Sequence, residues 1–281
     1  MLTPGINFTN FKIKKKSSLV KKNLISILKS KNEVVNSLSQ NYKNSFTKKL
    51  LRKYKKTHNY RVIGMGGSTL GTQTIYNFLK HKITKKFIFS DNLQANPNKN
   101  KKKYTNLIVS KSGNTIETIV NANIYIKNKN KNIFITGNKS SYLYSLAEKL
   151  KSDIIHHNNF IGGRYSVLSE VGMLPAELMG LKSSNFRQLN NLIKNKKFIN
   201  SLILNVSSTL YFIKKKRFNS VVINYDEKSE NLFNWYQQLV AESLGKKNKG
   251  LLPIISNMPK DNHSTMQLYL DGFKNNFFTF F

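Results

Sequence analysis

The order of apolar segments between residues 60 and 157 constrains the fold more than any other feature. Five short apolar segments alternate there with longer segments whose apolar residues recur at helical spacing. The predicted strands are YRVIGM, KKFIFSD, TNLIVS, NIFITG and DIIHH, and the predicted helices are 71–82, 115–129 and 141–151. Such alternation is typical of a parallel sheet covered by helices on both faces.

The same alternation returns in the C-terminal part of the chain. Predicted strands at 220–225 and 251–256 are followed by predicted helices at 231–245 and 263–272. Helices within 183–216 join the two α/β parts. A basic N-terminal arm precedes the first of these parts. In that arm Leu19, Leu24, Ile27 and Leu28 share a helix face.

The predicted fold class is therefore α/β: two doubly wound parallel-sheet lobes, each a three-layer αβα arrangement, with an N-terminal helical arm. We expect four divisions: an arm at 1–59, a first α/β domain at 60–180, connecting helices at 181–216 and a second α/β domain at 217–281.

The chain ends at an apolar strand, NNFFTFF, with no predicted helix after it. An apolar strand at a sheet edge is normally covered, because its free backbone groups invite aggregation. We therefore expect the second lobe to be incomplete, either because the polypeptide is cut short or because a partner covers the strand.

Composition favours a soluble protein of the cell interior, and we expect a cytoplasmic location with no membrane partner. Apolar residues make up 39% of the chain, but no window reaches the ~18 continuous apolar residues of a membrane span. No secretory signal is recognisable at the N-terminus. Cysteine is absent, which excludes disulfides, zinc–thiolate sites and cysteine nucleophiles.

The formal charge of +34 raises the possibility of nucleic-acid binding. The lysines are spread along the chain with Asn and Ile, and no helix-turn-helix or aromatic RNA-binding motif accompanies them. We favour a solvated lysine surface that also steers small anions. With 13 carboxylates in the chain, few residues can act as a general base.

The stretch RVIGMGGSTLG places glycines directly after a predicted strand and before a helix. Such turns bring backbone N–H groups and a helix N-terminus to an anion. A dinucleotide site would use Asp91 at the end of the next strand, but Ser68 and Thr69 occupy the position of its third glycine. A nucleoside-triphosphate loop matches less well, because Thr72 and Gln73 follow Gly71 where Lys and Ser/Thr are required. A tight turn without a ligand remains open.

A second strand-to-helix turn, SKSGNTIET, carries three hydroxyls at Ser110, Ser112 and Thr115. Several hydroxyls around one helix N-terminus suit a phosphate monoester, whose terminal oxygens need many donors. The alternative is a helix cap with Glu117 in the first turn, which accounts for one of the three hydroxyls.

Five segments in this order, GMGGSTLG, SKSGNTIET, GGRYSVLSEVGMLP, WYQQLVAESLGK and HSTMQ, resemble the signature segments of the phosphoglucose isomerase family. The likeness runs from about Val62 to Gly272 and is greatest to the family's shorter bacterial form. It implies two sugar-isomerase (SIS-type) lobes that interconvert glucose 6-phosphate and fructose 6-phosphate through a cis-enediolate. It also implies a homodimer and neither a redox cofactor nor a metal.

The resemblance implies roles for particular residues. Glu242 is the base that moves the proton between C1 and C2, Arg164 stabilises the enediolate, and His263, from the neighbouring subunit, assists ring opening. Glu117 orients the phosphate loop, and Gly163 lies beside the sugar. The implied phosphate site consists of Gly67, Ser68, Ser110, Lys111, Ser112, Thr115 and Gln238.

The residues themselves leave alternatives open. Helical spacing puts Gln238 and Glu242 on one face, but an isolated glutamate there is ordinarily an exposed surface group. Arg164 would otherwise pair with a neighbour such as Glu170, and His263 would be a solvated histidine.

The family also uses a lysine and a glutamine near its C-terminal end, which nothing in this chain matches. Lys274 lacks the context, so no role is transferred to it, and we expect ring opening to be impaired. A second function class is a sugar-phosphate-binding SIS module without catalysis. A basic nucleic-acid-binding protein is a third.

Overall fold

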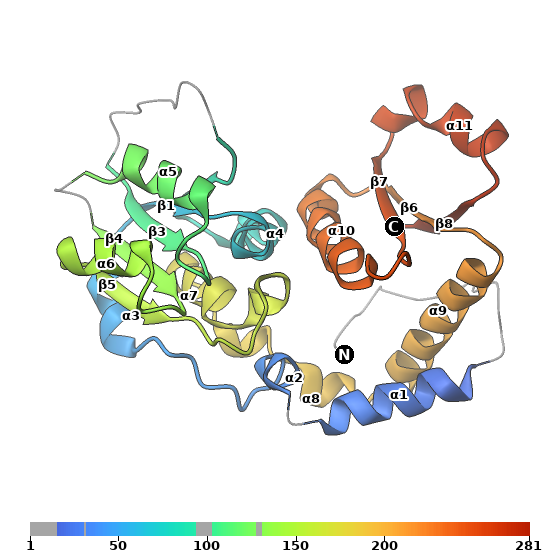
Figure 1. Ribbon diagram of the computed structural model, residues 1–281, viewed down its shortest axis with the longest axis horizontal. Coiled ribbons are helices and arrows are strands. Elements are labelled where there is room, and N and C mark those ends of the chain that lie inside the picture. The colour runs from blue at the N-terminus through green and yellow to red at the C-terminus, as the bar shows by residue number, and fades with distance from the viewer. Residues whose placement is uncertain (1–15, 31, 94–102, 128–130) are drawn as a thin grey trace.

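The computed structural model describes residues 16–30, 32–93, 103–127 and 131–281. Two α/β lobes stand side by side, and the helices α1 and α9 cross below the second lobe (Figure 1). The first fifteen residues of the predicted arm, and residues 128–129 of the predicted helix 115–129, lie outside the described residues.

The first lobe is a five-stranded parallel sheet in the order β2-β1-β3-β4-β5. Its strands are β1 (Asn59–Ile63), β2 (Lys86–Ser90), β3 (Thr105–Val109), β4 (Asn132–Thr136) and β5 (Asp153–His156). Every residue of β3 and β4 is buried, which explains why these strands are apolar without alternation. The predicted five strands are confirmed.

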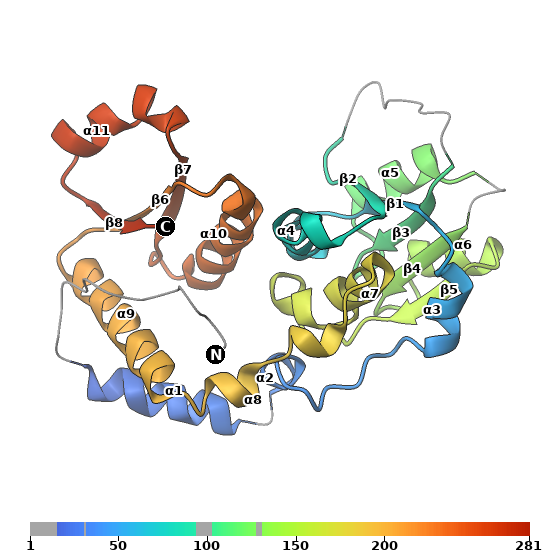
Figure 2. The same cartoon turned by 180° about the vertical axis from the view of Figure 1, so that it is seen from behind.

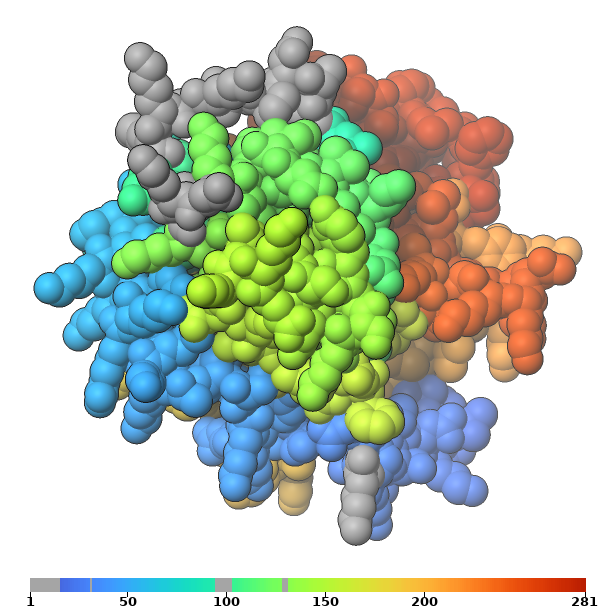
Figure 3. Space-filling view, turned by 60° about the vertical axis from the view of Figure 1, so that its left-hand side comes forward, coloured from blue at the N-terminus to red at the C-terminus, as the bar shows by residue number. Residues whose placement is uncertain are grey.

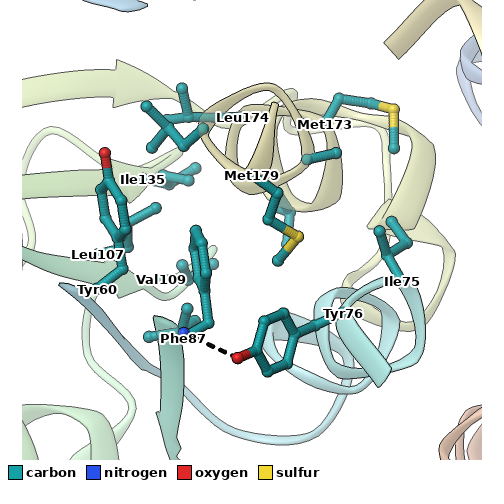
Figure 4. Close-up of a cluster of buried hydrophobic side chains, with 14 of the residues drawn as sticks. Tyr60, Ile75, Tyr76, Phe87, Leu107, Val109, Ile135, Met173, Leu174 and Met179 are labelled. Carbon is teal, nitrogen blue, oxygen red and sulfur yellow. Dashed lines mark hydrogen bonds between the residues drawn. The ribbon is translucent and has the colours of Figure 1, made fainter. Parts of the chain in front are cut away.

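Successive residues of each strand face opposite layers of helices. One layer consists of α3 (Lys48–Tyr54), α4 (Leu70–Phe78) and α7 (Glu170–Met179), and the other of α5 (Ile116–Tyr125) and α6 (Tyr142–Lys149). On the first side, Tyr60 stacks on Phe87, whose backbone N–H donates to the Tyr76 hydroxyl (Figure 4). On the second, Ile63, Ile108 and Phe134 pack against α5 and α6.

Helix α7 was not predicted from the sequence. Nine of its ten residues are buried, so it has no polar face and no amphipathic period to recognise. It also contains Pro175, which ordinarily argues against a helix interior. Packing of Met173, Leu174 and Met179 against the sheet outweighs that local preference. Figure 2 shows α7 close against the first-lobe sheet.

The second lobe is a three-stranded parallel sheet in the order β7-β6-β8. It contains β6 (Asn219–Asn224), β7 (Leu252–Asn257), β8 (Asn276–Phe280), α10 (Glu230–Leu244) and α11 (Met266–Asp271). The chain passes from β7 to the other side of β6, as in a doubly wound sheet. The prediction that His263 opens a helix was wrong: it ends the short 3₁₀ helix Lys260–His263, and α11 begins at Met266.

Besides α3, the described residues of the arm and the connection contain the α-helices α1 (Ser18–Lys29), α2 (Glu33–Ser37), α8 (Leu189–Leu192) and α9 (Lys196–Lys214). Helix α1 lies against α9, where the Ser17 backbone N–H donates to the Ser207 hydroxyl at 3.2 Å. The predicted apolar face of α1 was wrong in part. Leu24 and Leu28 are half-buried, whereas Leu19 and Ile27 are exposed, because α9 covers one side only.

The two lobes meet along α4 and α10. In Figure 3 the green and yellow-green surface of the first lobe lies in front of the orange surface of the second lobe. Trp235 of α10 packs against the core of the first lobe. None of the described helices is long and apolar enough to span a bilayer.

Replacing a core leucine of α7 should destabilise the first lobe far more than replacing an exposed one. Leu174→Ala leaves a cavity and should lower the free energy of unfolding by about 2–5 kcal/mol. Leu93→Ala in the same lobe, where the side chain is 52% exposed, should change it by less than ~0.5 kcal/mol. Urea denaturation compares the two. Equal effects would contradict the buried position of α7.

Candidate active site

The chain leaves β1 and β3 at their carboxyl ends, where parallel α/β sheets ordinarily bind ligands. The helices that follow, α4 and α5, cover opposite faces of the sheet, so the two strand-to-helix turns separate there. The first turn is the 3₁₀ helix η1 (Gly66–Ser68), and the second runs from Ser110 to Thr115. Both glycine- and hydroxyl-rich motifs therefore lie at one edge of the sheet.

The three hydroxyls of the second turn converge. Ser110 Oγ lies 2.9 Å from Thr115 Oγ1, and Ser112 Oγ lies 3.5 Å from each of them. Thr115 is the N-cap residue of α5, yet its side chain makes no capping hydrogen bond. The helix-cap alternative is thus met in position, with Thr115 at the N-cap and Glu117 in the first turn, but not by a side-chain hydrogen bond. The first turn of α5 keeps its backbone N–H groups free of a side-chain cap.

Two glycines of η1 leave room for other parts of the protein. A Cβ on Gly67 would lie 2.4 Å from the backbone carbonyl of Gly163, which begins the 3₁₀ helix η3 (Gly163–Leu168). Gly66 has a left-handed φ of +50°, and a Cβ there would lie 2.8 Å from the side-chain nitrogen of Gln238. These close approaches bring η1, η3 and α10 together.

Arg164 and Glu242 meet across the two lobes. Arg164 Nη1 donates to Glu242 Oε1 at 2.7 Å, and Gln238 Nε2 donates to Glu242 Oε2 at 3.3 Å. The predicted juxtaposition of Gln238 and Glu242 on one helix face is confirmed. The Arg164 side chain is 17% exposed and that of Glu242 is 52% exposed, so the carboxylate is open to a ligand.

Sequence reasoning missed three residues that hold Arg164. Trp235 Nε1 donates to the Arg164 carbonyl at 3.2 Å, and Arg164 Nε donates to Ser243 Oγ at 2.9 Å. The guanidinium also lies over the ring of Tyr165, 4.6 Å from its centroid. In the sequence, Tyr165 directly follows Arg164 and Ser243 directly follows Glu242. That adjacency is the signal by which the sequence could have identified them.

The suggested alternative partner of Arg164 was wrong. Glu170 is buried and accepts a hydrogen bond from the Tyr42 hydroxyl at 2.9 Å. Asp91, considered as a ribose-binding acid, accepts one from the Gln73 side chain within the first lobe.

Other predicted residues are not joined to this group. His263 is exposed, and among the described residues its side chain has no hydrogen bond to Arg164, Glu242 or Gln238. Lys274 donates to the Leu270 carbonyl at the end of α11. The two turns contain Ser68 and Lys111, and the first turn of α5 contains Glu117. No hydrogen bond between described residues joins these three side chains to the hydroxyl cluster.

A separate apolar cavity of about 440 Å³ lies between α4 and α10. Side chains such as Ile75, Phe78, Leu168 and Leu239 line it, with Tyr165 and Trp235 at its border with Arg164. Its apolar lining does not suit a charged sugar, so the polar residues of the two strand-to-helix turns are the better candidates for binding a phosphate ester.

Solved structures share this architecture. A hypothetical protein of Thermus thermophilus superposes with a TM-score of 0.75 at 22% identity, over 93% of this chain and 69% of that one. A glucose-6-phosphate isomerase of Chlamydia trachomatis superposes with a TM-score of 0.62 at 18% identity, over 94% of this chain and 54% of that one. The chain thus has the two-lobed α/β fold found in sugar-phosphate isomerases.

Sequence similarity is more specific. The chain belongs to the phosphoglucose isomerase family, whose model matches residues 29–251. A glucose-6-phosphate isomerase of Methanocaldococcus jannaschii is 35% identical over 251 residues, 82% of this chain and 62% of the relative. The chain therefore spans less than two thirds of that relative's length.

The glycine contact gives a test of the site's construction. Gly67→Ala should lower the free energy of unfolding by about 1–3 kcal/mol, because its methyl group would press on the Gly163 backbone. Gly163→Ala is the matched control: no atom lies within 4 Å of the added Cβ, so the change should stay below ~0.5 kcal/mol. Thermal and urea unfolding measure both, and an equally tolerated Gly67→Ala would refute the contact.

Proposed function

We propose that this protein is an aldose–ketose isomerase that interconverts glucose 6-phosphate and fructose 6-phosphate in the cytoplasm. The observation that carries the proposal is the meeting of Glu242, Arg164 and Gln238 from two lobes. A cluster of three hydroxyls lies in the other strand-to-helix turn at the carboxyl edge of the first-lobe sheet. Family membership supports the same reaction.

The reaction needs one base and one cation. With the open-chain aldose bound, Glu242 removes the proton from C2, and negative charge moves onto O1 of the enediolate. A proton then passes from O2 to O1, and Glu242 returns its proton to C1 to give the ketose. Arg164 stabilises the enediolate, because its guanidinium stays positively charged and attracts the negative charge that develops on the enediolate oxygens.

The hydroxyl cluster is the proposed phosphate site. Ser110, Ser112 and Thr115 offer hydroxyl donors, and the N-terminus of α5 adds backbone N–H groups and positive partial charge. Gly67, Ser68 and Lys111 border this site in the proposal, and Gly163 borders the sugar. Gln238 contributes its amide, whose Oε1 is buried without a partner among the described residues and would be satisfied by a ligand hydroxyl.

We further propose that the working form is a homodimer in which His263 of one copy serves the site of the other. The exposure of His263 and its lack of a bond to its own Arg164–Glu242 pair are consistent with that role. The four divisions 1–59, 60–180, 181–216 and 217–281 are proposed as structural units, which the two separate sheets support.

A sugar-phosphate-binding module without catalysis is the second candidate. It would need the hydroxyl cluster but not the Arg164–Glu242 pair, and both are present. Nucleic-acid binding rests on net charge alone and is less favoured.

Removing the proposed base should abolish turnover without unfolding the protein. Glu242→Gln should lower kcat by roughly 10²–10⁴-fold, because the amide cannot accept the C2 proton. Glu230→Gln, exposed at the start of the same helix, is the matched control and should keep wild-type activity. Fructose 6-phosphate formation and exchange of the C2 proton in D₂O measure the effect. A folded wild-type chain inactive in both assays would favour the binding module.

Removing phosphate donors should weaken substrate binding. Ser110→Ala and Thr115→Val should each raise KM about 10-fold or more, the expected cost of a hydrogen bond to a charged group. Ser140→Ala, exposed in the loop before α6, is the control and should leave KM unchanged. Salt-dependent DNA binding equal in all three variants, with no change in KM, would instead support the nucleic-acid alternative.

A further inference from the structure

Two neutral side chains, one from each lobe, are hydrogen-bonded at the edge of the Arg164 guanidinium. The Tyr165 hydroxyl lies 2.6 Å from Ser243 Oγ, and the same Ser243 oxygen accepts from Arg164 Nε at 2.9 Å. Tyr165 also presents its ring to the guanidinium. Arg164 is therefore held on one edge by Ser243, on one face by Tyr165 and at Nη1 by Glu242.

We propose that Tyr165 and Ser243 are positioning residues that keep the Arg164 guanidinium aimed at the sugar while Glu242 changes charge during the reaction. The inference rests on the proposed isomerase function and extends it to two residues outside the proposed catalytic and phosphate-binding set.

The reason lies in which contacts survive each step. When Glu242 accepts the C2 proton it becomes neutral, and its attraction for Arg164 falls as the enediolate gains negative charge. The contacts with Ser243 and Tyr165 do not depend on that proton. They engage Nε and one face, so Nη1 can turn to the enediolate oxygens as its attraction for the neutralised Glu242 falls. Without them the long arginine side chain would regain rotamer freedom at the moment its position matters.

The same geometry gives Tyr165 a spectroscopic signature. Burial raises the pKa of its hydroxyl, but the hydrogen bonds with Ser243 and Arg164 and the charges of Arg164 and Lys246 together outweigh burial and lower that pKa below its ordinary value. Of these groups, Arg164 belongs to η3, Ser243 to α10, and Lys246 to the residues after α10. Glu242 of α10 also faces the guanidinium. Above that pKa a tyrosinate would compete with Glu242 and the enediolate for Arg164.

A purely structural role is the competing explanation, because the Tyr165–Ser243 bond joins the lobes. Loss of a structural bond would lower the unfolding temperature and the active fraction, yet leave the pH profile of the folded enzyme unchanged. A positioning role predicts lower kcat, nearly unchanged KM and an altered alkaline limb.

Ultraviolet titration tests the geometry without any need for turnover. Of the 13 tyrosines, one should ionise below the others in the wild-type protein. That transition should vanish in Tyr165→Phe, move upward in Ser243→Ala and Arg164→Gln, and persist in Tyr144→Phe, a control on α6. If all tyrosines of the wild type ionise together, the positioning proposal fails even when the enzyme is active.

Steady-state kinetics test the role. Tyr165→Phe and Ser243→Ala should each lower kcat about 100-fold, the effect expected of a misplaced catalytic group, with KM changed less than about threefold. The double variant should lose little more than either single one, and Tyr165→Phe should remove the alkaline limb of the pH–rate profile. Additive losses with an unchanged limb would overturn the proposal. A wild type without turnover that keeps the low-titrating tyrosine would count against the isomerase function alone.

Discussion

The close approach of two backbones at Gly67 and Gly163 is the constraint on which the site depends. A side chain at Gly67 would collide with the carbonyl that begins η3. Because no Cβ intervenes, η3 lies directly on the turn after β1, and its next residue, Arg164, reaches α10 of the other lobe. Gly66 does the same for Gln238. Glycines in this motif therefore serve packing between parts of the protein, beside any role in approaching a ligand.

Carboxylates are few in this chain, which makes the Arg164–Glu242 ion pair more informative about function. The chain has 47 basic side chains and 13 carboxylates, and within the described residues just two ion pairs form, Lys53–Asp153 and Arg164–Glu242. A partly exposed ion pair adds little stability, so packing of Trp235 and the close approach of Gln238 to Gly66 contribute more to holding the lobes together. The pair is better understood as a prearranged base and cation than as a stabilising bridge.

The fold was largely predictable because a buried parallel sheet leaves a local signature. The eight strands of the described residues lie where apolar segments such as NIFITG and SVVINY indicated them. The signal is strongest in the central strands β3, β4 and β6, which are buried on both faces. Helix α7 escaped because complete burial removes the polar half of an amphipathic pattern. The face of α1 was misjudged because helical spacing does not say which side a neighbour such as α9 will cover.

For the site, the sequence by itself determined which functional groups are present and which of them are neighbours through local structure. The three hydroxyls lie in one short turn from Ser110 to Thr115, and Gln238 and Glu242 lie one helical turn apart. Only the tertiary structure decided that Arg164 pairs with Glu242 and not Glu170, and that Tyr165 meets Ser243. Those contacts join residues 78 positions apart, and local periodicity has no information about separations set by the packing of two lobes.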